Sequence, residues 1–505
     1  MPQRAEANAR SARRDAVTGV ERRWQSWPLS ELGWRSASAA VVLMLADWLT
    51  VFACLAAVWW LRARTAEHLL PTLGPVMPLS ALVVDLFVLL PWTFAFAEAR
   101  LYTRRAMFWD EAGRVLYACT LATLIAVVIS FAGGNAQRVS RLVIGGTWLA
   151  AIAVVPIVRY QVKRLLAAIG LWNKRVLILG AGETGRQIRV RILANPDLGY
   201  ETVAFVDDDA EKIGRVLDGL PVRGPLTAIP ELLRDLDIKD VVVAMPELPR
   251  ARLLHLVTTC EGRVQSIRLV PDLFGLTSVG VEAEDLDGVL LLHMRWNLAK
   301  PWNLLAKRGF DVAIAAAAVV ASAPLLALIA LAIRFDSHGP VFFRQERMGR
   351  GRRLFECIKF RTMYVAGDER LHAHLTGDAD GRAEWERFRK LKSFDPRVTR
   401  VGRVLRRLSL DELPQLINVF RNEMSLVGPR PYLPDEAERM GDFGETVLKA
   451  PPGITGLWQV SGRNNLTFEQ RLRLDEYYVR NWSLWMDAVV LLKTVTAVLK
   501  GQGAY

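Results

Sequence analysis

The sequence predicts an α/β membrane protein built from a four-helix transmembrane bundle, a Rossmann-like α/β domain, a re-entrant membrane helix and a mixed α/β catalytic domain. Three observations lead to this prediction. Hydrophobic residues make up 51% of the 505 residues although 23% are charged. Four apolar runs fall within the first 160 residues, and after residue 172 the pattern changes to strand, glycine turn and helix.

The first 36 residues form a basic segment with seven arginines and without the apolar core of a cleaved signal peptide. We expect a disordered arm here. The formal net charge of the whole chain is +13, which suits nucleic acid, an anionic membrane surface or phosphorylated substrates, and composition alone does not separate these partners. The four cysteines are far apart, so neither a disulfide framework nor a zinc site is indicated.

Residues 37–160 contain the four apolar runs, each close to the ~20 residues that span a bilayer. The runs are 37–61, 79–96, 115–132 and 142–158. Buried helices of a soluble core are the alternative interpretation. Short loops between the runs and tryptophans near their ends favour membrane spans.

Lysine and arginine are more frequent in the N-terminal arm, in the second loop and after the fourth run than in the first and third loops. Arg159 and Lys163 belong to the basic residues after the fourth run. The positive-inside rule therefore places the N-terminus and the chain after residue 160 in the cytoplasm. Asp47 and Asp85 lie within the runs, and we expect them to pair with neighbouring helices rather than to form an ion path.

Residues 172–295 have the pattern of a Rossmann-like domain. A buried strand at 174–179 leads into Gly180-Ala-Gly-Glu-Thr-Gly185, and Asp207 follows the next strand, 22 positions after the last glycine. The motif predicts either dinucleotide binding or a turn kept for strand–helix packing. No Tyr-x-x-x-Lys pair occurs in residues 172–300, so a regulatory or structural domain is favoured over an active dehydrogenase.

Residues 301–334 contain a fifth apolar run with basic residues at both ends, which places both ends on the cytoplasmic side. Pro324 lies near the middle of this run, where it removes a helix hydrogen bond and kinks or breaks the helix. We therefore predict a re-entrant helix that enters one leaflet and returns. A straight fifth span is the alternative.

Residues 335–505 carry the candidate chemistry, namely the adjacent carboxylates Asp411 and Glu412 among arginines and lysines. The candidate clamps for a diphosphate are Lys359, Arg361, Arg406 and Arg430. Either Ser409 caps a helix in an S-x-x-E box or Asp411 does, and in both cases the helix dipole favours ionised Asp411. Such a carboxylate could attack phosphorus while Glu412 holds Mg²⁺ against the diphosphate.

Several ordered motifs in this segment closely resemble the bacterial sugar transferases, the monotopic phosphoglycosyl transferases. They are Lys359-Phe-Arg-Thr-Met363, Asp395-Pro-Arg-Val-Thr-Arg-Val-Gly402, Leu408-Ser-Leu-Asp-Glu-Leu-Pro-Gln415, Ser425-Leu-Val-Gly-Pro-Arg-Pro431, Pro452-Gly-Ile-Thr-Gly456 and Trp458-Gln-Val-Ser-Gly-Arg463. With the spans and the Rossmann-like domain in front, the whole chain resembles the long form of the family. These are polyprenyl-phosphate hexose-1-phosphate transferases of the undecaprenyl-phosphate glucose or galactose phosphotransferase type.

The resemblance implies a two-step reaction on the cytoplasmic face of the bacterial inner membrane, at the start of exopolysaccharide, capsule or O-antigen synthesis. Asp411 would attack the β-phosphate of a UDP-sugar and release UMP, and undecaprenyl phosphate would then take the sugar phosphate from Asp411. Glu412 matches the family's metal-associated glutamate, with Mg²⁺ as the metal. Lys359, Arg406 and Arg430 match phosphate-binding positions, and Arg361 is added to them. The family's re-entrant helix usually breaks at Ser-Pro, whereas Ala323 precedes Pro324 here.

The expected partners are therefore a UDP-sugar, undecaprenyl phosphate and membrane lipids, without nucleic acid, and the large membrane and Rossmann-like surfaces are compatible with a homodimer. The alternative function is a membrane-tethered, NAD-dependent nucleotide-sugar dehydratase or epimerase, which leaves residues 335–505 unexplained. A non-catalytic scaffold is a third alternative. The run 482–493 has the aromatic, apolar and basic positions of an interfacial helix, and it could equally pack on the catalytic core.

Overall fold

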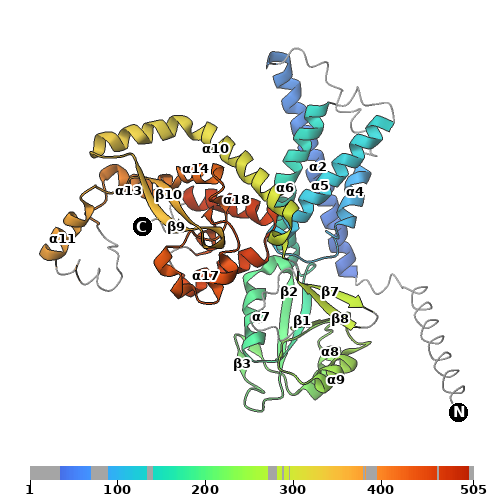
Figure 1. Cartoon of the computed structure of the whole chain (residues 1–505). Coiled ribbons are helices and arrows are strands. Elements are labelled where there is room, and N and C mark those ends of the chain that lie inside the picture. The colour runs from blue at the N-terminus through green and yellow to red at the C-terminus, as the bar shows by residue number, and fades with distance from the viewer. Residues whose placement is uncertain are drawn as a thin grey trace, which may run out of the picture. The chain divides into compact units, whose positions relative to one another are not determined.

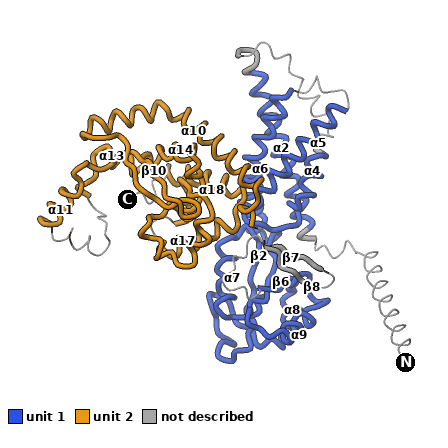
Figure 2. Tube along the Cα trace, viewed as in Figure 1, with its two compact units in different colours: residues 1–272 blue, residues 273–505 orange. Residues whose placement is uncertain are grey.

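The computed structural model describes residues 34–69, 89–132, 140–270, 281–286, 289–294, 296–378, 382, 395–462 and 466–499. The chain forms two compact units, Met1–Asp272 and Leu273–Tyr505, each with hydrophobic clusters of its own (Figure 2). The predicted basic arm lies outside the described residues, except for its last three residues, which begin the first helix.

Unit 1 begins with apolar helices. They are α2 (Trp34–Leu69), α4 (Leu89–Glu98), α5 (Phe108–Ala132) and α6 (Arg141–Ala168) (Figure 1). Within the described chain, four helices are long and apolar enough to cross a membrane: Ala37–Arg64, Phe108–Ala132, Arg141–Ala168 and the later Pro301–Asp336. The first, third and fourth predicted runs are thus confirmed as long apolar helices. Most of the second run, with Asp85, lies outside the described residues.

A buried charge network joins three of these helices. Arg159 of α6 is fully buried, and it contacts Asp47 of α2 at 2.5 Å and Glu111 of α5 at 2.8 Å. Lys163 contacts Glu111 at 2.6 Å. The prediction that Asp47 pairs with a neighbouring helix is confirmed. Arg159 and Lys163 are not free flanking charges, however, because each is neutralised inside the bundle.

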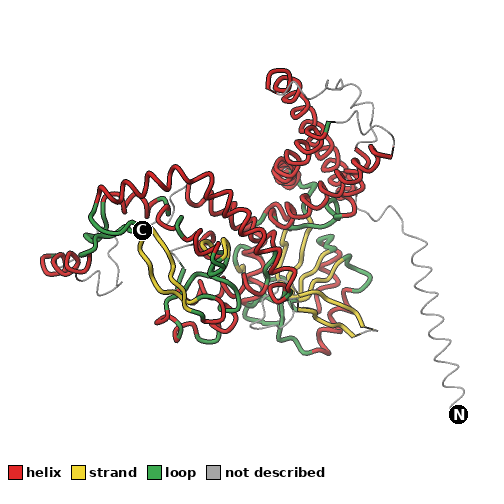
Figure 3. The backbone as a smooth tube through the Cα atoms, turned by 45° about the horizontal axis from the view of Figure 1, so that its top comes forward, coloured by secondary structure: helices red, strands yellow, loops and turns green. Residues whose placement is uncertain are grey.

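The second half of unit 1 is a parallel sheet with strand order β2-β1-β5-β6. Its strands are β1 (Lys174–Leu179), β2 (Tyr200–Val206), β5 (Asp240–Val243) and β6 (Ser266–Leu269). Alternate side chains of β1 point to opposite faces: Leu177 and Leu179 pack with α8 (Ile229–Asp235) and α9 (Arg250–Cys260), and Ile178 packs on the side of α7 (Glu183–Ala194). Figure 3 shows these strands in yellow with helices on both sides. The predicted Rossmann-like pattern is confirmed.

The smaller elements of unit 1 are η3 (Pro196–Leu198), the hairpin β3 (Val216–Leu217) with β4 (Leu220–Pro221), and η4 (Leu226–Ala228).

Hydrogen bonds at η3 connect the helical bundle to the sheet domain. Arg105, between α4 and α5, donates hydrogen bonds from Nη1 to the carbonyls of Leu198 and Gly199, both at 2.7 Å. Gly199 has a φ of 61°, and a Cβ there would overlap Trp172, so this turn requires glycine.

Unit 2 contains the hairpin β7 (Val281–Leu286) and β8 (Val289–Met294), then η5 (Asn297–Ala299) and the long helix α10 (Pro301–Asp336). The antiparallel pair β9 (Phe342–Met348) and β10 (Leu354–Phe360) follows, linked by η6 (Arg350–Arg352), and β11 (Ser425–Val427) pairs in parallel with β12 (Gly453–Thr455). The remaining elements are α11 (Gly367–Gly377), α13 (Arg400–Arg407), η7 (Leu410–Glu412), α14 (Gln415–Phe420), η8 (Pro434–Glu436), η9 (Glu438–Met440), α15 (Phe443–Val447), α16 (Leu457–Ser461), α17 (Phe468–Arg480) and α18 (Leu484–Leu499).

Helix α10 runs without interruption through Pro324, so the predicted break is absent. The residues on both sides of Pro324 are mainly alanine and leucine, which are strong helix formers and tolerate the loss of one hydrogen bond. The helix instead curves along its length (Figure 1). The Ser322 hydroxyl donates to the carbonyl of Ala318 at 2.6 Å, a contact that often accompanies bending.

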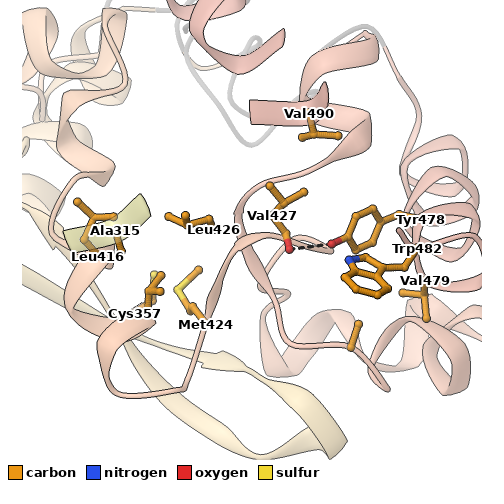
Figure 4. Close-up of a cluster of buried hydrophobic side chains, with 12 residues drawn as sticks. Ala315, Cys357, Leu416, Met424, Leu426, Val427, Tyr478, Val479, Trp482 and Val490 are labelled. Carbon is orange, nitrogen blue, oxygen red and sulfur yellow. Dashed lines mark hydrogen bonds between the residues drawn. The ribbon is translucent and has the colours of Figure 1, made fainter. Parts of the chain in front are cut away.

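The core of unit 2 lies between the first half of α10, β11, α17 and α18 (Figure 4). Tyr478 donates to the carbonyl of Val427 at 2.9 Å, and Lys307 of α10 donates to the same carbonyl at 2.9 Å. Lys307 also contacts Asp487 of α18 at 2.7 Å. Helix α18 packs on the core through Val490, as the second interpretation of 482–493 expects. Other apolar side chains of the helix, among them Leu492 and Val495, are exposed, and the interfacial interpretation stays a prediction.

Candidate active site

The segment before the two carboxylates is held by close packing. Thr399 is the N-cap of helix α13, and its side chain accepts a hydrogen bond from the Gly402 amide at 2.9 Å. Gly402 lies so close to the backbone of Thr362 that a Cβ would overlap the Thr362 carbonyl. The glycine therefore lets α13 rest directly on the chain that follows β10, and Arg406 near the end of α13 donates to Thr362 Oγ1 at 2.9 Å.

Asp411 and Glu412 lie on the short 3-10 turn η7. Ser409 precedes this turn with a φ of 54°, and its side chain makes no capping hydrogen bond, so both capping interpretations are wrong. Pro414 occupies the N-cap position of α14, where its missing N–H costs nothing. Leu410 packs in one cluster with Ile329 and Ile333 of α10, so the turn rests on the long apolar helix.

A cavity of about 920 Å³ opens at this turn. Five of the six predicted site residues line it: Lys359, Arg361, Arg406, Asp411 and Glu412. They come from β10, the chain after it, α13 and η7, which are separated by up to about fifty residues in sequence. A site that combines two carboxylates with three cationic side chains can bind a multiply charged phosphate ester while keeping a carboxylate within reach of it.

The two carboxylates of the cavity have different electrostatic environments. Lys359 Nζ contacts Glu412 Oε1 at 2.7 Å. Burial, together with the adjacent Glu412 charge, raises the pKa of Asp411 above its usual range, and Lys359 and Arg406 oppose this shift. The expectation that the helix dipole favours ionised Asp411 is therefore wrong for the net effect, because burial dominates.

Arg361 lines the cavity and also contacts the residue that follows α10. Its Nη2 donates to the carbonyl and the hydroxyl of Ser337, at 2.7 and 2.9 Å, just after α10 ends. The side chain is 6% exposed, and within the described chain its Nε and Nη1 have no hydrogen-bond partner. Arg361 thus ties the end of α10 to the cavity wall, with its Nε and Nη1 buried.

Arg430 is the predicted site residue that does not line the cavity. Its guanidinium lies 5.7 Å from the ring centroid of Trp458, and its amide donates to Asp475 at 3.2 Å. Arg471 lies over the same ring at 4.9 Å. Because Trp458 lines the cavity, Arg430 reaches the site in this structure only through that ring.

The sequence did not single out three residues that build the site. Asp368 and Arg397 line the cavity, and Arg397 pairs with Asp395 at 2.7 Å. Asn418 is fully buried: its Oδ1 accepts from the Ile358 amide at 3.0 Å, and its Nδ2 donates to the Glu356 carbonyl at 2.7 Å. It thereby joins α14 to β10. The sequence contains a signal for this role, because Asn418 is a polar residue within the apolar run of α14.

The donor set for a metal is small. In the described part of the chain, no group of three or more His, Cys, Asp or Glu side chains comes together. Mg²⁺ is commonly held by one or two carboxylates together with substrate phosphates and water. Asp411 and Glu412 at the cavity fit that mode of binding and do not fit an all-protein metal cage.

The glycine turn of unit 1 makes close contacts within its own domain. Asp207 at the end of β2 accepts from the Ala181 amide at 2.7 Å. A Cβ at Gly185 would overlap the Gly180 carbonyl, so this glycine is needed for the turn itself. A dinucleotide-binding turn also needs its last glycine for close packing, so these contacts are compatible with both interpretations of the motif.

Comparison with known proteins identifies two regions. Residues 302–501 match the bacterial sugar transferase family, and residues 100–271 match the CoA-binding domain family. A UDP-galactose-lipid carrier transferase of Erwinia amylovora is 37% identical over 408 residues, which cover 80% of this chain and 84% of that protein. An undecaprenyl-phosphate galactose phosphotransferase of Salmonella typhimurium is 36% identical, with 80% and 84% covered. An exopolysaccharide production protein of Rhizobium meliloti is 47% identical, with 41% and 91% covered.

Proposed function

The chain belongs to the bacterial sugar transferase family, and we propose that it transfers a hexose-1-phosphate from a UDP-sugar to undecaprenyl phosphate. The products are undecaprenyl-diphosphate-sugar and UMP, and the reaction is a membrane step of exopolysaccharide synthesis. The observation that carries this proposal is the placement of Asp411 and Glu412 in one cavity with Lys359, Arg361 and Arg406. The wording of the relatives' names supports the substrates.

In the first step, an Asp411 oxygen attacks the β-phosphorus of the UDP-sugar. An O–P bond forms to Asp411, the bond between the β-phosphorus and the bridging oxygen breaks, and UMP leaves with that oxygen. Lys359 and Arg406 lower the pKa of Asp411 and so favour the ionised nucleophile. Their positive charges also bind the negatively charged diphosphate.

In the second step, a phosphate oxygen of undecaprenyl phosphate attacks the same phosphorus. The bond between Asp411 and phosphorus breaks, which restores the free carboxylate. Glu412 would hold Mg²⁺ once a diphosphate draws Lys359 away from it, because a carboxylate cannot serve both fully. When bound during the first step, the metal would supply positive charge to the diphosphate oxygens of the donor.

The re-entrant course of α10 is part of the proposal, and packing at both ends of the helix supports it. Near its start, Arg308 donates to the Val419 carbonyl at 2.5 Å. At its end, Asp336 accepts from the Val401 amide at 3.0 Å, and Ile333 packs with Leu405. Both ends therefore contact the same small domain although the 36-residue helix is ~54 Å long, and this supports a course in which both ends stay on one side of the membrane.

We further propose that the catalytic domain lies on the cytoplasmic face of the bacterial inner membrane, where UDP-sugars occur. With Arg159 and Lys163 buried in ion pairs, three basic residues remain after the fourth run: Arg164, Lys174 and Arg175. The basic residues at both ends of α10 give additional support. A homodimer stays a prediction, to be checked by light scattering of the protein in detergent.

The test is release of UMP from a panel of UDP-sugars by the purified protein, with and without undecaprenyl phosphate and Mg²⁺. We expect UMP and a lipid-linked sugar with one of the UDP-hexoses. Absence of UMP with every UDP-sugar would contradict the proposal. Formation of an oxidised or dehydrated nucleotide sugar with NAD would instead point to the Rossmann-like domain as the catalytic part.

A further inference from the structure

The cavity at Asp411 has a second kind of wall. Besides the charged residues it is lined by apolar side chains of α14, β11, β12 and α18: Leu416, Leu426, Ile454, Leu491 and Val498. Leu416 and Leu426 belong to the buried core of unit 2, and Figure 4 shows them in that cluster. Ile454 and Leu491 pack against the same core. This wall is therefore a fixed part of the domain.

One face of α18 supplies much of this wall. Leu491, Thr494 and Val498 are spaced by three and four residues, so they lie on the same side of the helix. Thr494 donates to the Val490 carbonyl at 2.7 Å, and its oxygen lies 2.8 Å from the Thr455 hydroxyl. The two hydroxyls satisfy each other, so the face presents carbon atoms to the cavity.

A UDP-sugar is polar along its whole length, and its uracil would need hydrogen-bond partners that the side chains of Leu426, Ile454, Leu491 and Val498 do not supply. The acceptor lipid is different, because a phosphate is joined directly to a hydrocarbon chain. A cavity with phosphate-binding cations at one wall and carbon at another matches that chemistry. The two walls belong to one continuous cavity, so a single molecule can reach both.

We propose that the apolar wall formed by Leu426, Ile454, Leu491, Thr494 and Val498 binds the first isoprene units of the acceptor lipid while its phosphate lies at Asp411. This inference rests on the proposed transferase function and adds the residues that recognise the acceptor. The lipid would enter past Phe342 and Phe343, which line the cavity and are about half exposed. Leu331 and Phe335 of α10, which precede Phe342 and Phe343 in the sequence, are also apolar and exposed.

The two half-reactions allow a direct test with the full-length protein in nanodiscs. Leu491→Gln keeps the size of the side chain and makes the wall polar. Leu492→Gln is the matched control, because Leu492 is the next residue, is 54% exposed and does not line the cavity. Each variant is assayed for the burst of UMP from donor alone and for the KM of undecaprenyl phosphate.

We expect Leu491→Gln to leave the UMP burst intact and to raise the KM for undecaprenyl phosphate by about tenfold, since apolar contact with the chain is lost. Leu492→Gln should change neither quantity. An unchanged acceptor KM in Leu491→Gln with a normal burst overturns the inference and leaves the proposed function standing. Absence of the burst in the unmodified protein contradicts the proposed function instead.

A gentler variant covers the case in which Leu491→Gln disturbs the fold. Val498→Thr keeps the shape of the side chain and replaces one methyl group of the wall with a hydroxyl. We expect a normal UMP burst and a raised acceptor KM. If Val498→Thr weakens the burst as much as the acceptor step, or alters neither, the wall is not an acceptor site and the inference fails.

Discussion

At the scale of single residues, the Asp411 carboxyl is subject to opposing influences. Burial and the neighbouring Glu412 raise its pKa, and Lys359 and Arg406 oppose that rise. A nucleophilic carboxylate must be ionised, so activity is lost as the pH falls through this raised pKa. The acidic limit of the reaction should therefore lie above ~3.9, the value of an ordinary aspartate.

Replacing Lys359 tests this balance. Lys359→Met removes a positive charge that favours ionised Asp411, so we expect the acidic limb of the donor half-reaction to move to higher pH and the rate at neutral pH to fall. The measurement is the rate of the UMP burst between pH 4.5 and 8. Arg407→Gln is the control, because Arg407 is exposed and does not line the cavity. An unshifted acidic limb in Lys359→Met would contradict this account of Asp411.

Asp475 offers a test by stability. Burial raises its pKa to about 7, while Tyr432 donates to it at 2.8 Å. The folded state then holds a proton that the unfolded chain releases near pH 4, so stability falls as pH rises from about 4 to 7. Asp475→Asn mimics the protonated group and should weaken this dependence, by up to about 4 kcal/mol across the window. Thermal unfolding at pH 5 and pH 7.5 measures it, and parallel curves for both proteins would refute it.

The sequence motifs identified residues that meet in the folded chain, and the chemical roles of these residues stay predictions. The Asp-Glu pair and the cations were identified in advance, and the structure brings five of these six residues to one cavity. Asn418 was missed because its partner Ile358 is 60 positions away and becomes its neighbour only in the folded chain. Arg397 and its partner Asp395 are two positions apart, but the sequence does not show that Arg397 reaches the cavity. The capping interpretations failed at Ser409, where tertiary packing of Leu410 against α10 selects a left-handed residue instead of a helix start.

At the scale of elements, α10 decides where the site lies. Lys307 and Asp311 in its first half contact β11 and α18, and Ile329 and Ile333 in its second half pack under the Asp411 turn. Sequence predicted an apolar helix with cytoplasmic ends. It did not predict that the helix would continue through Pro324, because the neighbouring alanines and leucines outweigh one missing hydrogen bond.

Cysteine labelling tests the course of α10. The four native cysteines are buried, so an introduced thiol should dominate the reaction with a membrane-impermeant maleimide. Arg344→Cys, shortly after α10, should react only after the cells are permeabilised, as should Glu211→Cys in unit 1. Gln137→Cys, in the loop that the charge pattern places outside, should react in intact cells. Labelling of Arg344→Cys in intact cells would favour the straight fifth span.

At the scale of the whole molecule, the chain combines two units with separate cores. The clusters of unit 2 contain only residues from 298 onward, whereas unit 1 has its own bundle core and sheet core. The order of these parts followed from hydrophobic runs and strand–turn–helix patterns. The ion pairs of Arg159 and the hydrogen bonds of Arg105 did not, because they link residues about 50 to 110 positions apart.

Removing residues 1–295 therefore should leave a functional transferase. We expect the shortened chain to release UMP from the UDP-sugar, at a reduced rate if unit 1 is regulatory. The same truncation with Asp411→Asn is the control for contaminating activity. A shortened protein that unfolds cooperatively with heat but releases no UMP would show that unit 1 takes part in the reaction.

The most direct test of the central claim is to trap the sugar phosphate on Asp411. The protein is incubated with its UDP-sugar and Mg²⁺ without undecaprenyl phosphate, quenched in acid and analysed by peptide mass spectrometry. The account predicts one equivalent of UMP and a hexose-phosphate adduct on the peptide that carries Asp411, which disappears when the lipid is added and is absent in Asp411→Asn. UMP release that requires the acceptor, or an Asp411→Asn protein with full turnover, would contradict it.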